Sequence, residues 1–212
     1  DLKTFLERLG GEIPVMALGL GSNMIVRDGG VPGVVVRLGK AFAGVKHTGE
    51  MELTCGGGAS GILVASTARD LGIAGLEFLR GIPGTVGRFV RMNGGAYGRE
   101  VADVLLDCAV ILHDGSFITL NAAELEYSYR HSALPEGAIV VSARFRGRPG
   151  DPKDIGALIK EVQNDLVEEE AQYIKEFFFQ HYIGEIKRVS TRALPGYYKK
   201  KLAESLELVT NA

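Results

Sequence analysis

The chain has 212 residues, of which 46% are hydrophobic and 24% charged, and its formal net charge at pH 7 is −2. This composition is typical of a globular protein with a sizeable core, and it excludes collagen-like, disordered and disulfide-dense chains. The near-neutral charge argues against electrostatic binding of nucleic acid. No apolar run of 18 residues and no basic-then-apolar leader occurs, so we expect neither membrane insertion nor secretion. Two cysteines, Cys55 and Cys108, fit a reducing compartment.

Glycine is the unusual component of this sequence. The chain holds 29 glycines, about twice the usual share of roughly 7%. Of these, 26 lie in residues 1–150 and only three in residues 151–212. The segment RPGDP at residues 148–152 is a natural breaker. The sequence therefore predicts a boundary near residue 150.

Before this boundary, the residue pattern predicts short strands and few helices. Apolar residues at helical spacing, followed by Gly10-Gly11, predict a helix over residues 2–9. Apolar and β-branched runs between glycines predict strands over residues 14–18, 24–27 and 34–38. Because strands and helices do not alternate along the chain, we expect an α+β fold rather than a doubly wound sheet.

The next predicted element is a helix over residues 61–71, with Ser60 as its N-cap and Gly72 as its stop. Its packing residues are expected to be Ile62, Leu63, Ala65 and Leu71.

A hairpin and one long helix complete the predicted elements. The turn His113-Asp114-Gly115 predicts a hairpin of strands over residues 105–112 and 116–120. One more strand is expected over residues 138–145. After the boundary, apolar residues at helical spacing predict a helix over residues 154–179.

Four glycine-rich loops are the candidate ligand-binding segments. They read GLGSN at residues 19–23, GGG at 56–58, GIPGTVG at 81–87 and NGGAYG at 93–98. Glycine lets a ligand approach the backbone amides, and successive amides form a donor array suited to a pyrophosphate. None of the loops is a Walker A motif, and the first is not a Rossmann fingerprint, because Asn23-Met24 follows it and no helix opens there. The loops therefore indicate a pyrophosphate-bearing cofactor, with plain tight turns as the alternative.

These loops resemble those of a known family. The segments GLGSN with VRDGG (residues 26–30), GIPGTVG, MNGGAYG (92–98) and EYSYRHS (126–132) are similar in order and spacing to UDP-N-acetylenolpyruvoylglucosamine reductases (MurB). The resemblance covers about residues 1–165.

The resemblance implies the flavin-binding fold of the vanillyl-alcohol-oxidase (PCMH) type. Residues 1–40 would form the first FAD-binding subdomain and residues 41–150 the second. Residues 151–212 would be a mainly helical segment in place of the substrate domain.

The function implied is that of a cytoplasmic, monomeric enzyme of peptidoglycan precursor synthesis, and hence of cell-wall biogenesis, cell shape and cell division. NADPH would reduce non-covalently bound FAD, which would pass a hydride to UDP-N-acetylglucosamine enolpyruvate and yield UDP-N-acetylmuramate. The small nucleotide sugar would be the partner, with no nucleic acid, membrane or metal involved.

The resemblance also implies the site residues. Arg130 would be catalytic, since a guanidinium can hold the negative charge that builds on the substrate carboxylate. The FAD contacts would be Gly19, Gly21, Ser22, Asn23, Gly81, Ile82, Pro83, Gly84, Thr85, Gly87, Asn93, Gly94, Ala96, Tyr97 and Gly98.

The chain departs from the family pattern in three places. The proton-donating serine motif is absent, and Ser190 is only a faint echo of it. No late glutamate can be assigned after residue 167. Arg88 stands directly after Gly87, where a small residue is usual, so it either points outward or crowds the cofactor. We therefore expect impaired turnover.

Other interpretations stay open. The main one is a non-catalytic FAD-binding module fused to an unrelated helical tail, and another is an oxidase of the same superfamily. Cys55 and Cys108 are expected to be buried packing residues. Aromatic residues 177–179 and the YYKKK segment at 197–201 could be contact surfaces.

Overall fold

The computed structural model describes residues 1–21, 26 and 28–165. Contacts divide the chain into two compact units, Asp1–Val162 and Gln163–Ala212. Almost all of the described residues belong to the first unit. Among the described helices, none combines the length and the apolarity needed to cross a membrane.

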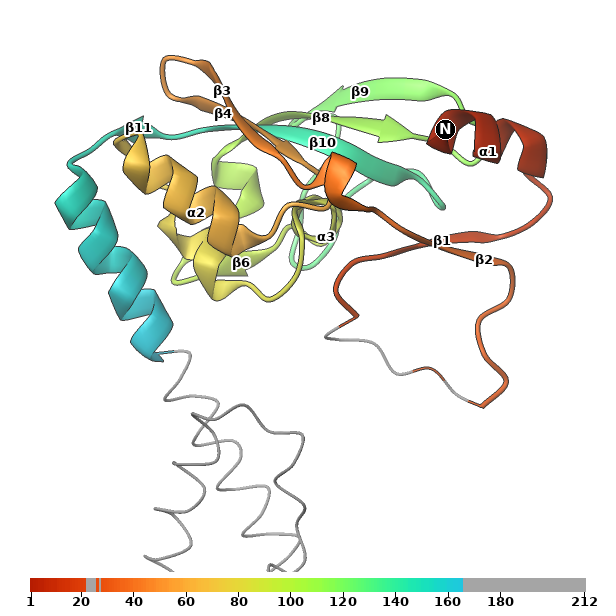
Figure 1. The fold of residues 1–212 in the computed structure, drawn as a ribbon, viewed down its shortest axis with the longest axis horizontal. Coiled ribbons are helices and arrows are strands. Elements are labelled where there is room, and N and C mark those ends of the chain that lie inside the picture. Colours follow the sequence, from red (N-terminus) through yellow and green to blue (C-terminus); the bar gives the residue numbers. More distant parts are fainter. Residues whose placement is uncertain (22–25, 27, 166–212) are drawn as a thin grey trace, which may run out of the picture. The chain divides into compact units, whose positions relative to one another are not determined.

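A five-stranded antiparallel sheet forms the centre of this unit (Figure 1). Its strand order is β3-β4-β10-β8-β9. The strands are β3 (Val45–Gly49), β4 (Glu52–Gly56), β8 (Leu105–Ile111), β9 (Phe117–Asn121) and β10 (Ile139–Arg146). The hairpin around His113-Asp114-Gly115 and the last strand are confirmed, whereas the β3–β4 hairpin was not predicted. Because β3 is an edge strand without a fully buried residue, its sequence lacks the alternation that marks a half-buried strand.

The two faces of the central strand β10 carry different residues. Ala143 and Phe145 are fully or almost fully buried, whereas Arg144 and Arg146 are exposed. On the exposed face, the Arg146 guanidinium lies 2.5 Å from a Glu52 carboxylate oxygen of β4, and Arg144 pairs with Asp107 of β8. Around these residues, one face of the sheet is therefore polar and the other belongs to the core.

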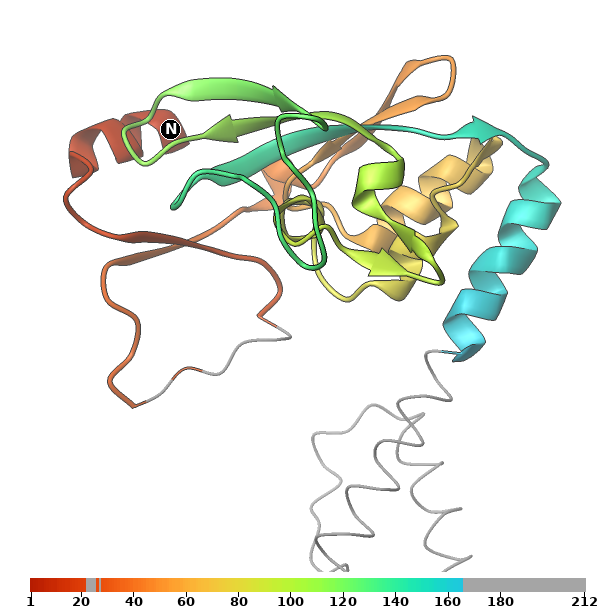
Figure 2. The same ribbon diagram turned by 180° about the vertical axis from the view of Figure 1, so that it is seen from behind.

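Two helices cover the core face, α2 (Gly61–Asp70) and α3 (Val86–Arg91), together with the 3₁₀ turn η2 (Glu77–Gly81) (Figures 1 and 2). Leu53, Cys55, Val64, Leu79, Val86, Phe89, Cys108 and Phe145 are all members of the resulting core cluster. Both cysteines are free and buried, as expected.

The helix α2 begins as predicted but packs through other residues. Ser60 Oγ accepts a hydrogen bond from the Leu63 amide at 3.2 Å, which confirms the N-cap. The buried residues are Gly61, Val64, Ala65 and Ala68, whereas Ile62, Leu63 and Leu71 are exposed. The prediction of these last three as packing residues was wrong, because the small residues allow the helix to lie close to η2. A Cβ on Gly61 would lie 1.9 Å from the Leu79 carbonyl oxygen.

The amino-terminal segment forms a second small core on the other side of the sheet. It contains α1 (Leu2–Leu9), which ends at Gly10 in the left-handed conformation, and the parallel strands β1 (Val15–Leu18) and β2 (Val34–Arg37). Leu6 packs there against Ile111, Ile139 and Val141. These three predicted elements are confirmed, and the strand predicted over 24–27 lies outside the described residues.

Short elements complete the unit. They are η1 (Lys40–Phe42), β5 (Ile73–Ala74), β6 (Gly95–Ala96), β7 (Arg99–Glu100), η3 (Val101–Asp103) and β11 (Arg148–Pro149). Residues 152–165 are helical, two residues earlier than predicted, and Asp151 accepts a hydrogen bond from the Lys153 amide at 2.7 Å. Ile155 and Ile159 pack on Ala65 and Ala74. The rest of the predicted helix lies outside the described residues.

Candidate functional site

The first candidate site is a cavity of about 470 Å³ between β1, β2, the start of α3 and the start of β10. Seven glycines line it: Gly19, Gly21, Gly57, Gly58, Gly84, Gly87 and Gly137. Three arginines, Arg37, Arg88 and Arg91, also line it, and no lining residue is acidic. Exposed backbone and uncompensated positive charge are the features that suit a phosphate-bearing ligand.

The first and third glycine loops meet in this cavity. A Cβ added to Gly19 would lie 3.2 Å from Thr85 Oγ1, so the two loops are in direct contact. Gly21 has φ +76°, and a Cβ there would meet none of the described residues within 4 Å. Gly21 therefore leaves open space that a ligand can enter. Ser22 and Asn23 of the same loop lie outside the described residues.

The third loop offers fewer free amides than its sequence suggests, because α3 begins inside it. The amides of Val86 and Gly87 donate to the carbonyl oxygens of Ala59 and Gly57 at 2.9 and 2.8 Å. No acceptor is recorded for the amides of Gly84 and Thr85 within the part of the chain that the structure describes. These two are therefore the donors that the loop offers to a ligand.

The second loop, residues 56–58, is glycine-rich because backbones approach closely there. A Cβ on Gly56 would lie 2.0 Å from the Phe42 carbonyl oxygen, and one on Gly57 would lie 2.0 Å from that of Val140. Real Cβ atoms do not come so close to another atom, so packing alone requires glycine at both positions.

A second cavity, of about 770 Å³, also borders α3. It is lined by loop residues Gly81, Ile82, Pro83, Asn93, Gly94, Gly95, Ala96 and Gly98, by Arg88, Phe89, Met92, Arg99, Glu100 and Asp103, and by Tyr129 and Arg130. It thus brings Arg130 together with the first three residues of the third loop and with most of the fourth loop. Tyr97 does not line either cavity, and its hydroxyl donates to the Val162 carbonyl oxygen at 3.0 Å.

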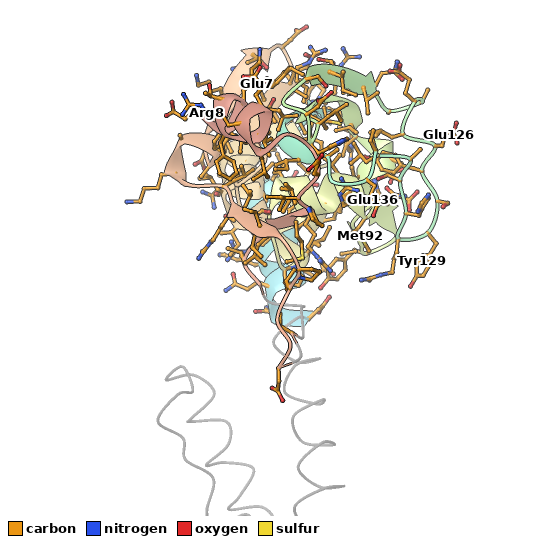
Figure 3. The ribbon with its side chains drawn as sticks, turned by 90° about the vertical axis from the view of Figure 1, so that its right-hand side faces the viewer. Glu7, Arg8, Met92, Glu126, Tyr129 and Glu136 are labelled. Carbon is orange, nitrogen blue, oxygen red and sulfur yellow. The ribbon has the colours of Figure 1, made fainter. Side chains whose placement is uncertain are left out.

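Arg130 stands in a tight turn at the rim of the second cavity. Ser128 and His131 exchange backbone hydrogen bonds of 3.2 and 3.1 Å, which leaves Tyr129 and Arg130 at the tip. Arg130 has φ +54°, a left-handed conformation that is costly for a residue with a side chain. In Figure 3 the segment with Glu126 and Tyr129 forms the outer margin, with Met92 nearer the middle. A strained, exposed arginine beside a cavity indicates a functional role.

Two buried side chains fix this turn against α3. Asn93 Nδ2 donates to the Ser128 carbonyl oxygen at 3.3 Å, and Asn93 Oδ1 accepts from the Ala102 amide at 3.0 Å. Ser132 Oγ donates to the Arg91 carbonyl oxygen at 2.7 Å. Both ends of the Asn93 side chain are thus used within the protein.

Arg91 was not singled out from the sequence. Its guanidinium donates to the carbonyl oxygens of Ala138 and Pro135 at 2.5 and 3.3 Å, and so holds the loop beside the first cavity. Burial lowers the pKa of this guanidinium, partly opposed by Cys108. The spacing of Arg88 and Arg91, one helical turn apart, could have flagged a basic helix face if α3 had been predicted.

The chain is similar in sequence to known flavin-binding proteins. A sequence profile of the FAD binding domain matches residues 9–121. The chain is similar to the UDP-N-acetylenolpyruvoylglucosamine reductase of Erythrobacter litoralis, 70% identical over 162 residues, which are 76% of this chain and 50% of that protein. The corresponding reductase of Novosphingobium aromaticivorans is 71% identical over 157 residues, 74% of this chain and 53% of that protein.

The fold is similar to that of a solved structure, the UDP-N-acetylenolpyruvylglucosamine reductase (MurB) from Thermus caldophilus, with a TM-score of 0.67 and 37% sequence identity. The match covers 77% of this chain and 59% of that one. The chain spans about half the length of the curated relatives it matches. These matches confirm the predicted α+β fold of the PCMH type. The chain belongs to the FAD binding domain family, and within it to the flavin-binding part of the UDP-N-acetylenolpyruvoylglucosamine reductases (MurB).

Proposed function

We propose that this chain binds FAD non-covalently across the two cavities and forms the flavin-binding part of a UDP-N-acetylenolpyruvoylglucosamine reductase. The observation that carries the proposal is the first cavity, with its seven glycines, three arginines and no carboxylate. A pyrophosphate needs close backbone approach and positive charge, and this lining offers both. The open space at Gly21 supports the fit of such a group to the residues present.

In this proposal the two cavities have different tasks. Arg37 and Arg91 provide positive charge for the pyrophosphate, and the Gly84 and Thr85 amides donate hydrogen bonds to it. Gly19 and Gly21, with Ser22 and Asn23, complete this part of the site. The remaining predicted contacts, Gly81, Ile82, Pro83, Asn93, Gly94, Ala96 and Gly98, line the second cavity. Tyr97 supports it from outside by its hydrogen bond to Val162.

Arg130 is the residue that would act on the substrate. When bound, FAD supplies hydride transfer from NADPH to the enolpyruvyl group of the nucleotide sugar. Reduction of that group places negative charge on the substrate carboxylate, and the Arg130 guanidinium at the cavity rim can hold this charge. The alternative of a non-catalytic FAD-binding module is not favoured, because relatives about 70% identical carry the reductase name.

The cellular setting follows from the same proposal. A reductase of peptidoglycan precursor synthesis would act in the cytoplasm on a small nucleotide sugar, as a monomer, and would contribute to cell shape and division. The separation of residues 1–40 and 41–150 into two flavin-binding subdomains stays a prediction.

Flavin uptake tests the proposal directly. The purified chain is titrated with FAD, and quenching of flavin fluorescence is followed; acid precipitation should then release the flavin into the supernatant. A colourless chain that takes up no added FAD would refute the proposal.

A pair of glycine variants makes this test specific to the first cavity. Gly21 and Gly10 have φ +76° and +72°, and a Cβ on either would meet nothing within 4 Å. Gly21→Leu and Gly10→Leu should therefore lower the free energy of unfolding by similar amounts. Only Gly21 lines the cavity, so only Gly21→Leu should weaken FAD uptake. Equal uptake by both variants would place the flavin elsewhere.

The reductase half of the proposal needs a separate measurement. Stopped-flow reduction by NADPH, followed by addition of the enolpyruvyl substrate, separates reduction of the flavin from its reoxidation. Arg130→Ala should leave FAD uptake and the first step unchanged and suppress the second. Unchanged reoxidation by Arg130→Ala would remove this residue from the chemistry.

A further inference from the structure

The residues Arg88 and Met92 connect the two cavities. They lie four residues apart, Arg88 in α3 and Met92 at its C-cap. Among the described residues, these two alone line both cavities. Side chains four residues apart lie on the same helix face. A ligand that extends from one cavity to the other must therefore pass this face of α3.

The position of the Arg88 side chain is restricted by its neighbours. Arg88 is half-buried, and a Cβ on Gly84 would lie 3.2 Å from Arg88 Cδ. Gly84 has φ +135°, which a residue with a side chain rarely adopts. The aliphatic part of the Arg88 side chain thus packs over Gly84, a position that has no side chain of its own. The Arg88 side chain therefore faces the site, which excludes the expectation that it points outward.

The Arg88 guanidinium has no acidic partner within the described part of the chain. The acidic residues of the second cavity are Glu100 and Asp103, and Asp103 is already paired with Arg99 at 3.3 Å and accepts a hydrogen bond from the Glu100 amide at 2.9 Å. The first cavity has no acidic residue. A half-buried cation without a counter-charge is a favourable partner for an anionic group of a ligand.

We infer that Arg88 pairs with a phosphate of the bound flavin nucleotide at the junction of the cavities, and so makes the site selective for phosphorylated flavin over riboflavin. The inference rests on the proposed function and deepens it, because it names the residue that couples affinity to the charge of the ligand. A residue that merely crowds the cofactor would have the opposite effect on affinity.

The test compares dissociation constants of FAD and riboflavin for the wild-type chain and Arg88→Gln. Loss of one charge-assisted hydrogen-bonding partner should weaken FAD binding about tenfold or more. Riboflavin affinity should stay unchanged, because riboflavin carries no phosphate. Raising the salt concentration should weaken FAD binding to the wild type more than to Arg88→Gln. Arg148→Gln, an exposed position in β11 outside both cavities, is the charge-matched control.

The flavin affinities of the Arg88 variants distinguish a phosphate contact from an obstruction or a role in shape. Unchanged or tighter FAD binding by Arg88→Gln would overturn the inference and identify Arg88 as an obstruction. An equal loss of FAD and riboflavin affinity would overturn it too, because it would show a role in shape and not in charge. Arg88→Lys keeps the positive charge and should restore part of the FAD affinity, which also serves if Arg88→Gln folds poorly. A wild-type chain that takes up no flavin would instead refute the proposed function itself.

Discussion

Asn93 ties the turn that carries Arg130 to the segment after β7. Its Nδ2 donates to the Ser128 carbonyl oxygen at 3.3 Å, while its Oδ1 accepts from the Ala102 amide at 3.0 Å. Asn93 is 4% exposed and has φ +44°, a conformation that asparagine tolerates better than most residues. Asn93 is therefore a positioning residue, whose side chain acts on the Arg130 turn.

Replacing Asn93 should destabilise the fold. Asn93→Ala leaves the Ala102 amide and the Ser128 carbonyl without their partner, which costs about 1–3 kcal/mol for a buried group. Urea unfolding measures this loss. Asn121→Ala is the matched control, because Asn121 also accepts backbone hydrogen bonds, from Ala123 and Glu124, but is exposed. An equal fall in the free energy of unfolding for both variants would show that the buried hydrogen bonds of Asn93 contribute no more than the exposed ones of Asn121.

Arg130→Gly should stabilise the fold while it removes the proposed chemistry. Glycine relieves the left-handed strain at φ +54°, and the net gain should be about 0.5–1 kcal/mol after the added freedom of the unfolded chain is subtracted. Thermal unfolding measures the gain. Arg148→Gly, at a position with ordinary φ, should give no gain. A lower melting temperature for Arg130→Gly would show that the side chain itself supports the turn.

Glycines required for packing can be distinguished from glycines that face open space. Gly57→Ala should prevent soluble folding, because its Cβ would lie 2.0 Å from the Val140 carbonyl oxygen. Gly44→Ala is the control, since a Cβ there meets nothing within 4 Å and its φ is ordinary. Solubility and circular dichroism of the two variants decide the matter. A folded, stable Gly57→Ala would mean that β4 and β10 can move apart at this point.

The two buried cysteines should remain unreactive in the folded protein. Burial raises the pKa of the Cys55 thiol from 9.0 to about 12, and burial together with Asp107 raises that of Cys108 to about 11. Because the thiolate is the reactive form, a thiol reagent at pH 8 should label neither residue until urea is added. Fast labelling without urea would show that the sheet opens locally.

The same shifts predict a fall of stability in alkali. The folded-state pKa values are raised, so the stabilisation is complete below pH 9 and is lost as pH rises towards 11–12, because the unfolded chain loses thiol protons that the folded chain retains. The Tyr127 hydroxyl, whose pKa is also raised by burial, adds to this loss. Unfolding free energies between pH 8 and 10.5 measure the slope. Cys108→Ala should make it shallower, and an unchanged slope would contradict the role of this thiol.

Much of the fold could be predicted from sequence because its signals are local. Gly10 ends α1, Ser60 caps α2, and the turn at residues 113–115 joins β8 to β9, each through chemistry within a few residues. Edge strand β3 was missed, because its burial depends on neighbours far along the chain. α3 was missed because its six residues cover fewer than two helical turns, too short a stretch for a periodic apolar pattern to be recognised.

The candidate site could be predicted from the resemblance to a known family, and less of it from the local residue pattern alone. The loop at residues 19–21 shares the first cavity with the second half of the third loop, whereas the loop at residues 93–98 shares the second cavity with its first half. Sequence could not show that Gly57 meets Val140 or that the Val86 amide is already bonded. Arg91 and the Asn93 connection depend on contacts with residues 35–47 positions away, which no local pattern encodes.

The ion pairs on the outer face of the sheet bear on how the strands find their alignment during folding. Arg146 meets Glu52, and Arg144 meets Asp107, at places two residues apart on the central strand. Such surface pairs contribute only about 0–1 kcal/mol each to stability. A shift of β10 by one position, however, would turn both guanidinium groups into the apolar interior and expose Phe145 to water. These charged residues thus contribute to the choice of strand register. They raise the free energy of the misaligned sheet far more than they lower the free energy of the native one.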